Sequence, residues 1–128
     1  MAIKTAYLTI DDSPSIDMGE KIEYLSVKGI SAVWFCSGAS LEKKPRPAVE
    51  AIHRWHPIGN HAYDHPHFSD IPFEECFDQI ERTDRIIGGL YEETSVPWRR
   101  KYFRFPYGDK GALTGDDALA APSAEGAR

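Results

Sequence analysis

Short apolar runs alternate along this chain with longer segments that are apolar on one side only. Three runs have the length and the β-branched and aromatic content of strands: residues 5–10 (TAYLTI), 30–36 (ISAVWFC) and 101–105 (KYFRF). Residues 58–60 (IGN) are a shorter candidate. The run at 30–36 is nearly continuous, as expected of a strand covered on both faces. The pattern therefore predicts four short strands.

Between these runs, apolar residues recur at the spacing of one helical face. Glycine and proline residues flank these segments, where they act as helix stops and first-turn residues. The alternation predicts parallel strands joined by right-handed helical crossovers, and so an α/β fold. Three helices are predicted. The first ends at Lys28, the second runs from Pro47 to before Pro57, and the third runs from Phe73 to Leu90.

Length and charge limit the class of protein. The 128 residues suit one domain, and a net charge of -5 argues against a nucleic-acid or anionic-membrane partner. Cys36 and Cys76 have no zinc-ribbon spacing and are expected to be small buried hydrophobes. The chain shows neither a signal-peptide pattern nor an apolar stretch near the roughly 20 residues of a membrane span. A cytoplasmic protein is therefore the expectation.

Polar clusters follow three of the predicted strands. Asp11 and Asp12 follow the first strand, His61 and His65 the third, and Arg104 stands at the end of the fourth. In parallel sheets and barrels, ligands bind at the carboxyl ends of the strands. These clusters are therefore expected to meet at one rim.

The histidine pair is a weak motif by itself, because two loop histidines often bond only to backbone. With Asp12, however, His61 and His65 offer two nitrogen ligands and one oxygen ligand, which leaves a metal an open position for water. Zinc is the first choice on ligand type, with cobalt or nickel as alternatives. The same ligand set holds iron in some oxygenases, but that interpretation leaves Asp11 and Arg104 unexplained.

Arg104 stands between bulky apolar residues in FRFPYG, where a charge needs a partner. Asp11 is the available carboxylate on the same rim, and a neighbouring arginine would favour its ionised form and fix its orientation. The turn formed by Pro106, Tyr107 and Gly108 could offer a backbone N–H to a developing oxyanion.

Three segments together resemble a known family. LTIDDSP (8–14), IGNHAYDHP (58–66) and FRFPYG (103–108) resemble the first three motifs of the polysaccharide deacetylases, the NodB-homology carbohydrate esterases. SAVWFCSG (31–38) is similar to that family's second strand. The resemblance covers about residues 5–108. It implies a distorted (β/α) barrel that hydrolyses N- or O-acetyl groups on chitin-like polymers, peptidoglycan or xylan.

The resemblance also implies roles for individual residues. Asp11 matches the catalytic base, and Arg104 matches the arginine that holds it. Tyr107 matches the residue whose backbone N–H helps to bind the oxyanion, and Pro106 matches one that lines the substrate groove. The implied ligands of a divalent metal are Asp12, His61 and His65.

The chain departs from the family pattern at several points. Ser13 stands in place of a usual glycine, and Ala62 in place of a serine or threonine that braces the metal loop. The later Leu-x-His motif, whose histidine is the general acid, is absent from these 128 residues. We therefore expect a partial barrel: a deacetylase-like domain at 1–108 that stops after the fourth strand, followed by an Ala/Gly/Asp-rich loop or tail at 109–128.

Three functions remain open on this basis. The first is a metal-dependent hydrolase that deacetylates a carbohydrate. The second is a non-catalytic half-barrel that binds metal or sugar, and the third is an amidase of the same fold that acts on a small non-sugar substrate. Unpaired strand edges in a half-barrel would also favour self-association.

Overall fold

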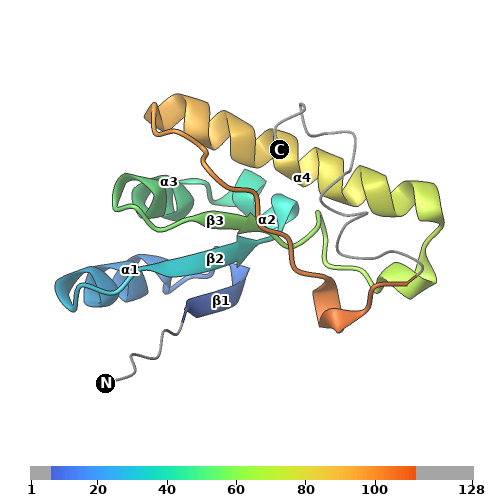
Figure 1. Cartoon of the computed structure of the whole chain (residues 1–128), viewed down its shortest axis with the longest axis horizontal. Helices are drawn as coiled ribbons and strands as arrows, with labels where there is room; N and C mark the ends of the chain where they lie inside the picture. Colours follow the sequence, from blue (N-terminus) through green and yellow to red (C-terminus); the bar gives the residue numbers. More distant parts are fainter. Residues whose placement is uncertain (1–6, 112–128) are drawn as a thin grey trace, which may run out of the picture.

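A parallel three-stranded sheet forms the centre of the molecule. The computed structural model describes residues 7–111 (Figure 1). The strands lie in the order β1 (Leu8–Ser13), β2 (Ala32–Cys36) and β3 (Ile58–Asn60). Helices connect each strand to the next, which is the crossover that parallel neighbours require. The predicted α/β class with parallel strands is confirmed.

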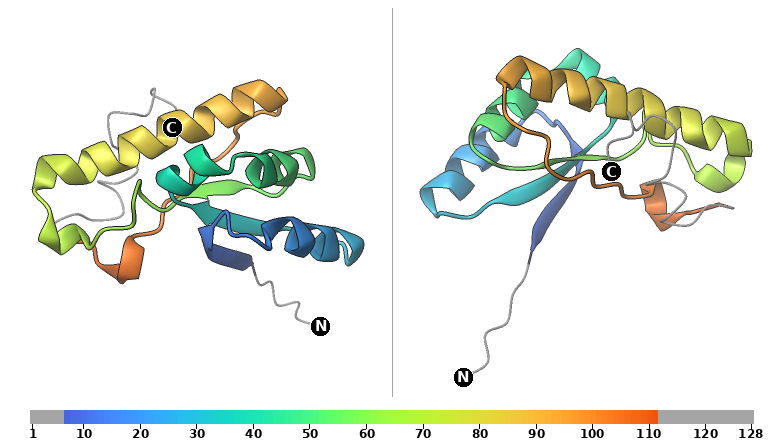
Figure 2. Two further views of the ribbon diagram at one scale, coloured as in Figure 1. Left: turned by 180° about the vertical axis from the view of Figure 1, so that it is seen from behind. Right: turned by 45° about the horizontal axis from the view of Figure 1, so that its top comes forward.

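Four helices accompany the sheet. α1 packs against α3, and α3 packs against α4. Seen from behind, in the left panel of Figure 2, α1 and α3 lie in front of the strands. Their apolar side chains form the main core with Trp34 of β2 and Ile58 of β3, while Phe35 contacts His61 and Arg104 instead. The helices are α1 (Met18–Val27), α2 (Gly38–Lys43), α3 (Arg46–His53) and α4 (Phe73–Thr94).

The segment at 101–105 differs from the predicted fourth strand. It forms one isolated parallel bridge, between Asn60 and Phe103. The backbone N–H of Asn60 donates to the Tyr102 carbonyl oxygen, and that of Arg104 donates to the Asn60 carbonyl oxygen. The pairing is short because β3 itself has only three residues before the chain turns away. The segment nevertheless lies beside β3, where a fourth strand would stand.

The helices differ from the prediction in length and number. The pattern missed α2, because six residues are too few to show an apolar face. α4 continues past the predicted end at Leu90, since Leu90 and Tyr91 both remain buried, and it ends only at Ser95, whose φ is 60°. α3 ends before His56, which is buried beyond the helix. Residues 5 and 6 of the first predicted strand, and 112–128 of the predicted tail, lie outside the described residues.

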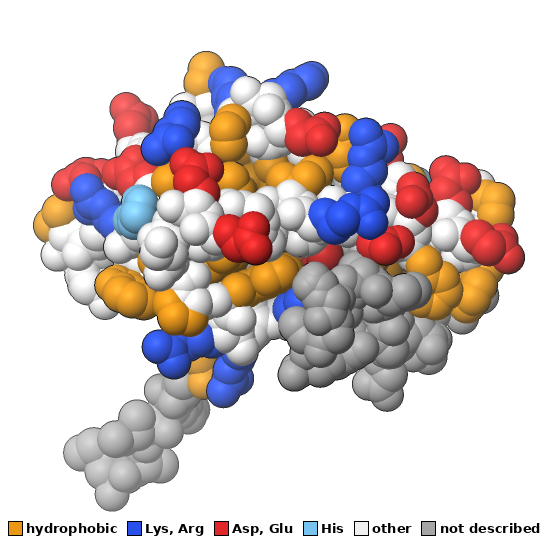
Figure 3. Space-filling model, turned by 90° about the horizontal axis from the view of Figure 1, so that it is seen from above, with side chains coloured by type: hydrophobic (Ala, Val, Ile, Leu, Met, Phe, Trp, Pro, Cys, Tyr) orange, Lys and Arg blue, Asp and Glu red, His pale blue; other side chains and the backbone are white. Residues whose placement is uncertain are grey.

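The surface and the interior agree with the composition. Cys36 and Cys76 are free and buried, as the sequence indicated. Acidic and basic side chains are interspersed over the face that α4 presents (Figure 3), and Glu81 pairs with Arg85 at 3.0 Å. Within residues 7–111, no helix combines the length and the apolar character needed to cross a membrane.

We expect Asn60→Ala to destabilise the fold by roughly 2–4 kcal/mol. The buried side chain donates to the Ile80 carbonyl oxygen and to Asp84, and it accepts from the N–H of Ala62. Alanine would remove all three of these hydrogen bonds from a buried site. Denaturant unfolding would measure the change, with Glu92→Ala on the exposed side of α4 as the control. Equal unfolding midpoints for the two variants would contradict the expectation.

Candidate metal and hydrolytic site

Three side chains of ligand type meet at the carboxyl ends of β1 and β3. Asp12 Oδ1 lies 3.5 Å from His61 Nε2 and 3.0 Å from His65 Nε2. One ligand atom from each of the three residues lies within 4.8 Å of the others. The structure thus brings together the three predicted ligands. Two imidazole nitrogens and a carboxylate oxygen converging on one point are a donor set that fits a divalent metal.

The ring of His61 is held in one orientation. Its side chain is 3% exposed, and its Nδ1 donates to the carbonyl oxygen of Arg104 at 2.7 Å. A carbonyl can only accept, so Nδ1 carries a proton and Nε2 is the nitrogen that faces Asp12. A hydrogen bond from the ring nitrogen that does not bind the metal is how proteins orient a metal-binding histidine.

Other hydrogen bonds brace the histidine loop, in which Ala62 has no hydroxyl group. The N–H of Ala62 donates to Asn60 Oδ1 at 2.8 Å, and its carbonyl oxygen accepts from Gly38 N at 3.0 Å. Gln79 of α4 accepts from the N–H of Tyr63 at 2.7 Å. Sequence reasoning missed Asn60 and Gln79. A polar residue on the buried side of α4 was the available signal for Gln79.

The predicted ion pair is present beside the ligand cluster. Arg104 Nη1 lies 2.8 Å from Asp11 Oδ1 and donates to Thr9 Oγ1 at 3.1 Å. The guanidinium also lies 4.4 Å above the ring of Phe35. The side chains of Arg104 and Asp11 are 41% and 39% exposed, so water screens the pair. Its main consequence is therefore to orient the Asp11 carboxylate.

An irregularity in β1 separates the two neighbouring carboxylates. Asp11 and Asp12 lie within β1. The sequence pattern predicts them after the first strand instead. The register with β2 shifts between Ile10 and Ser13, which is the signature of a bulge. A bulge re-aims side chains next to functional sites. Here Asp11 reaches Arg104, while Asp12 reaches the histidines.

Left-handed backbone conformations gather at this site. Asp12, Ala62, His65 and Tyr107 have φ between 59° and 70°, and within residues 7–111 only two other non-glycine residues share this region. Such conformations carry a cost for residues with a side chain and cluster at functional sites. The arrangement of this rim is therefore fixed by the surrounding hydrogen bonds and not by local preference.

A second group of residues joins the two loops. The His67 ring stacks on Tyr107, with centroids 3.6 Å apart and planes 10° apart, and His67 Nδ1 lies 3.4 Å from Asp109 Oδ2. Hydrogen bonds from the Ser69 hydroxyl, then from the N–H groups of Ser69 and Gly111, lower the pKa of Asp109 to about 2. Sequence reasoning missed Asp109, which fell in the predicted tail.

These residues surround an open hollow of about 630 Å³. Pro106 is buried and is not among the residues that line it, so its contact with substrate stays a prediction. Tyr107 lies beside it and is 63% exposed. The hollow is lined by Asp11, Asp12, His61, His65, Phe103, Arg104, Phe105, Tyr107, Gly108 and Lys110.

Known proteins similar to this chain include carbohydrate deacetylases. It is 32% identical over 103 residues to the peptidoglycan-N-acetylglucosamine deacetylase of Bacillus cereus, a match that covers 80% of this chain and 36% of that protein. It is 29% identical to the chitooligosaccharide deacetylase of Azorhizobium caulinodans, over 80% of this chain and 47% of that one. A family 4 carbohydrate esterase from Streptomyces lividans superposes with a TM-score of 0.74 at 28% identity, over 93% of this chain and 57% of that one.

The chain therefore spans between about a third and three-fifths of the length of these relatives. The structural likeness extends to deacetylases whose (β/α) barrels it covers by about half, so the fold is a partial barrel. The family model for polysaccharide deacetylases matches residues 1–123, which include every residue of the hollow. This chain belongs to the polysaccharide deacetylase family.

Proposed function

We propose that this chain carries the metal-binding and proton-accepting part of a hydrolase that removes acetyl groups from a carbohydrate. The observation that carries the proposal is the convergence of Asp12, His61 and His65 beside the Asp11–Arg104 ion pair. The names of the relatives support N-acetylated sugars of peptidoglycan or chitooligosaccharides as the substrate class.

Asp12, His61 and His65 would hold the metal, with zinc as the first choice and cobalt or nickel as alternatives. A zinc ion in such a site supplies Lewis acidity and a water with a pKa of about 7. The hydrogen bond from His61 to the Arg104 carbonyl oxygen keeps Nε2 free to act as a ligand. The exposed carboxylate of Asp12 approaches both histidines and completes the set.

Asp11 is the base in this proposal. The ion pair with Arg104 orients its carboxylate, which would accept the proton of the attacking water. The backbone N–H of Tyr107, a residue that also lines the hollow, would donate to the oxygen of the acetyl carbonyl as negative charge develops there. The products are acetate and the freed amine or hydroxyl of the sugar.

The metal assignment predicts that His61→Ala, His65→Ala and Asp12→Ala each weaken zinc binding by at least about a hundredfold. Loss of a residue that only orients a ligand already lowers metal affinity by about 10–100-fold, and loss of a ligand should lower it by no less. Calorimetric titration of chelator-treated protein would measure the affinity. His53→Ala, at the exposed end of α3, is the matched control. Retention of tight zinc binding by all three variants would exclude the site.

The base assignment predicts that Arg104→Ala lowers kcat for acetate release by about 10²-fold or more, while zinc affinity changes less than about threefold. The substitution frees Asp11 but keeps the carbonyl oxygen that holds His61. Arg104→Lys should fall between, because lysine keeps the charge without the planar fork. Arg85→Ala, which breaks an exposed pair on α4, serves as the control. An equal loss of turnover and metal affinity would show that the roles are wrong.

The 128-residue chain should release acetate faster from an acetylated xylan than from an N-acetylglucosamine oligomer. An amine leaves only after it is protonated, and a general acid that supplies this proton raises the rate by about 10²–10⁴-fold. The motif that carries the family's general acid is absent from these 128 residues. An acetyl ester depends less on such an acid because its leaving group is better. Asp11→Asn should abolish both activities. Brisk N-deacetylation would contradict the expectation. Zinc binding without acetate from any substrate would favour the non-catalytic half-barrel, and release from only a small amide would favour the amidase.

A further inference from the structure

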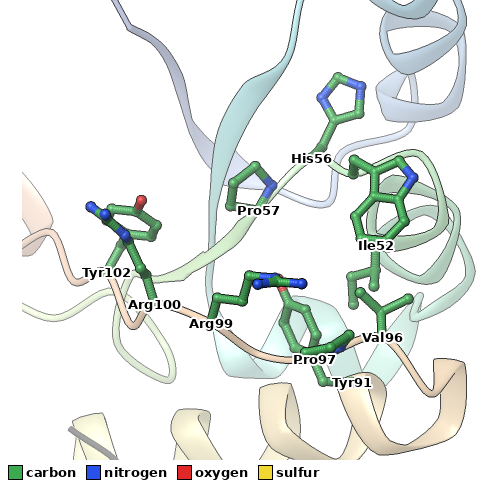
Figure 4. A pocket seen from close by; sticks show the side chains of 10 residues that line it. Ile52, His56, Pro57, Tyr91, Val96, Pro97, Arg99, Arg100 and Tyr102 are labelled. Atoms are coloured by element: carbon green, nitrogen blue, oxygen red, sulfur yellow. The ribbon is translucent and has the colours of Figure 1, made fainter.

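A second pocket lies at the opposite end of the sheet from the hydrolytic hollow. It has a volume of about 220 Å³ and lies between the turn after α3, the end of α4 and the segment that leads to residue 102 (Figure 4). Pro57, which lines it, immediately precedes β3, whereas His61 immediately follows β3. The volume is below the ~300–1,000 Å³ typical of drug-sized sites, and so suits a single ring with its substituents.

The walls of this pocket offer positive charge without a counter-charge. Arg99 and Arg100 both line it, no acidic residue does, and Figure 4 shows Arg99 extending into the middle of the group. Among the arginines of residues 7–111, these two have no ion pair, side-chain hydrogen bond or aromatic partner within that range. The arginines that have one are Arg46, Arg54, Arg82, Arg85 and Arg104. In a chain of net charge -5, two free guanidinium groups at one pocket fit an anion.

Trp55 supplies a free aromatic face at the same pocket. It is 67% exposed and has φ 67°. The N–H of His56 bonds to the Ala51 carbonyl oxygen and that of Trp55 to the Ile52 carbonyl oxygen, which is the Schellman ending of a helix. The left-handed position of that motif favours glycine, and a bulky residue there is an outlier. Neither local preference nor burial explains a tryptophan at this position, and such exceptions mark functional sites.

The other groups at the pocket are suited to the same kind of ligand. The Tyr91 hydroxyl accepts from the N–H of Ile58, which leaves its own O–H as a donor. His56 accepts at Nδ1 from the N–H of Ala32, and burial lowers its pKa, so the positive charge comes from the arginines. Trp98 is already stacked on Tyr91, with centroids 5.6 Å apart, and is less available than Trp55 as a platform.

We propose that this pocket binds a carboxylate-bearing sugar residue of an acidic polysaccharide. The carboxylate pairs with the guanidinium groups of Arg99 and Arg100, and the apolar face of the ring packs on the indole of Trp55. Bound there, a polymer is held at the amino end of β3 while another part of it reaches the hollow, which raises its effective concentration. The anchoring role rests on the proposed deacetylase function, whereas the binding itself does not.

Binding can be measured without turnover, in the presence of a chelator, by calorimetric titration with a tetramer of a hexuronic acid. A neutral N-acetylglucosamine tetramer and inorganic phosphate are the comparison ligands. The hexuronate should bind at least about tenfold more tightly than either, and more weakly as salt is added. Arg99→Ala with Arg100→Ala should remove this preference. The control pair Arg46→Ala with Arg85→Ala changes the net charge equally but lies away from the pocket, and it should retain the preference.

Trp55→Gly separates a binding role from a structural role. Glycine suits the left-handed position, so the melting temperature should stay level or rise, while hexuronate affinity falls by about tenfold or more. Trp55→Phe should keep most of the affinity, and Tyr24→Ala, which removes an exposed aromatic residue from α1, should keep all of it.

Three results would overturn the proposal. The first is no hexuronate binding by the unaltered chain. The second is equal affinity for the neutral tetramer or for phosphate, which would indicate a general surface or a simple anion site. The third is Trp55→Gly with a lowered melting temperature and unchanged affinity, which would make Trp55 a structural residue. Loss of zinc binding or of deacetylation would leave these readings unaffected, so failure of the proposed function can be recognised separately.

Discussion

The hydrogen bonds of Asn60 hold together the parts of the chain that form the candidate site. Its backbone joins β3 to the segment at 102–104, its side-chain amide donates to α4, and its side-chain oxygen accepts from Ala62. Asn60 is 2% exposed, so its polar groups have to find their hydrogen-bond partners within the protein and not in water. His61 is the next residue in the chain. The loops that carry His61 and Arg104 are therefore fixed relative to each other by a network that needs neither metal nor substrate.

Two neighbouring carboxylates have different surroundings because of the backbone between them. The bulge in β1 and the left-handed conformation of Asp12 direct Asp12 to the histidines and Asp11 to Arg104. One carboxylate thus joins two imidazole nitrogens, while the other pairs with the guanidinium of Arg104. Arranging charged groups before the reaction is what makes such a site effective, since little reorganisation is needed when charge develops.

Features with a local cause could be predicted from the sequence, and features with a distant cause could not. The alternation of strands and helices follows from short-range periodicity, and it is confirmed for the first three strands. The bracing of the histidine loop by Gln79 depends on how α4 lies over that loop, which no periodicity reports. The continuation of α4 past Leu90 to Thr94 has the same kind of cause, because Tyr91 is buried against the main core. Asp109 was missed because its partner Ser69 is 40 residues earlier in the chain.

The sequence by itself determined which residues with chemical function stand at the ends of the parallel strands. Because parallel strands present their carboxyl ends at one edge, this order was enough to predict that Asp12, His61 and Arg104 would meet. Only the tertiary structure decided the distances, the hydrogen bond that orients His61 and the meeting of Arg99 and Arg100 at one pocket. Those properties depend on contacts between residues far apart in the chain, 93 positions for Arg104 and Asp11, and packing in three dimensions selects such contacts.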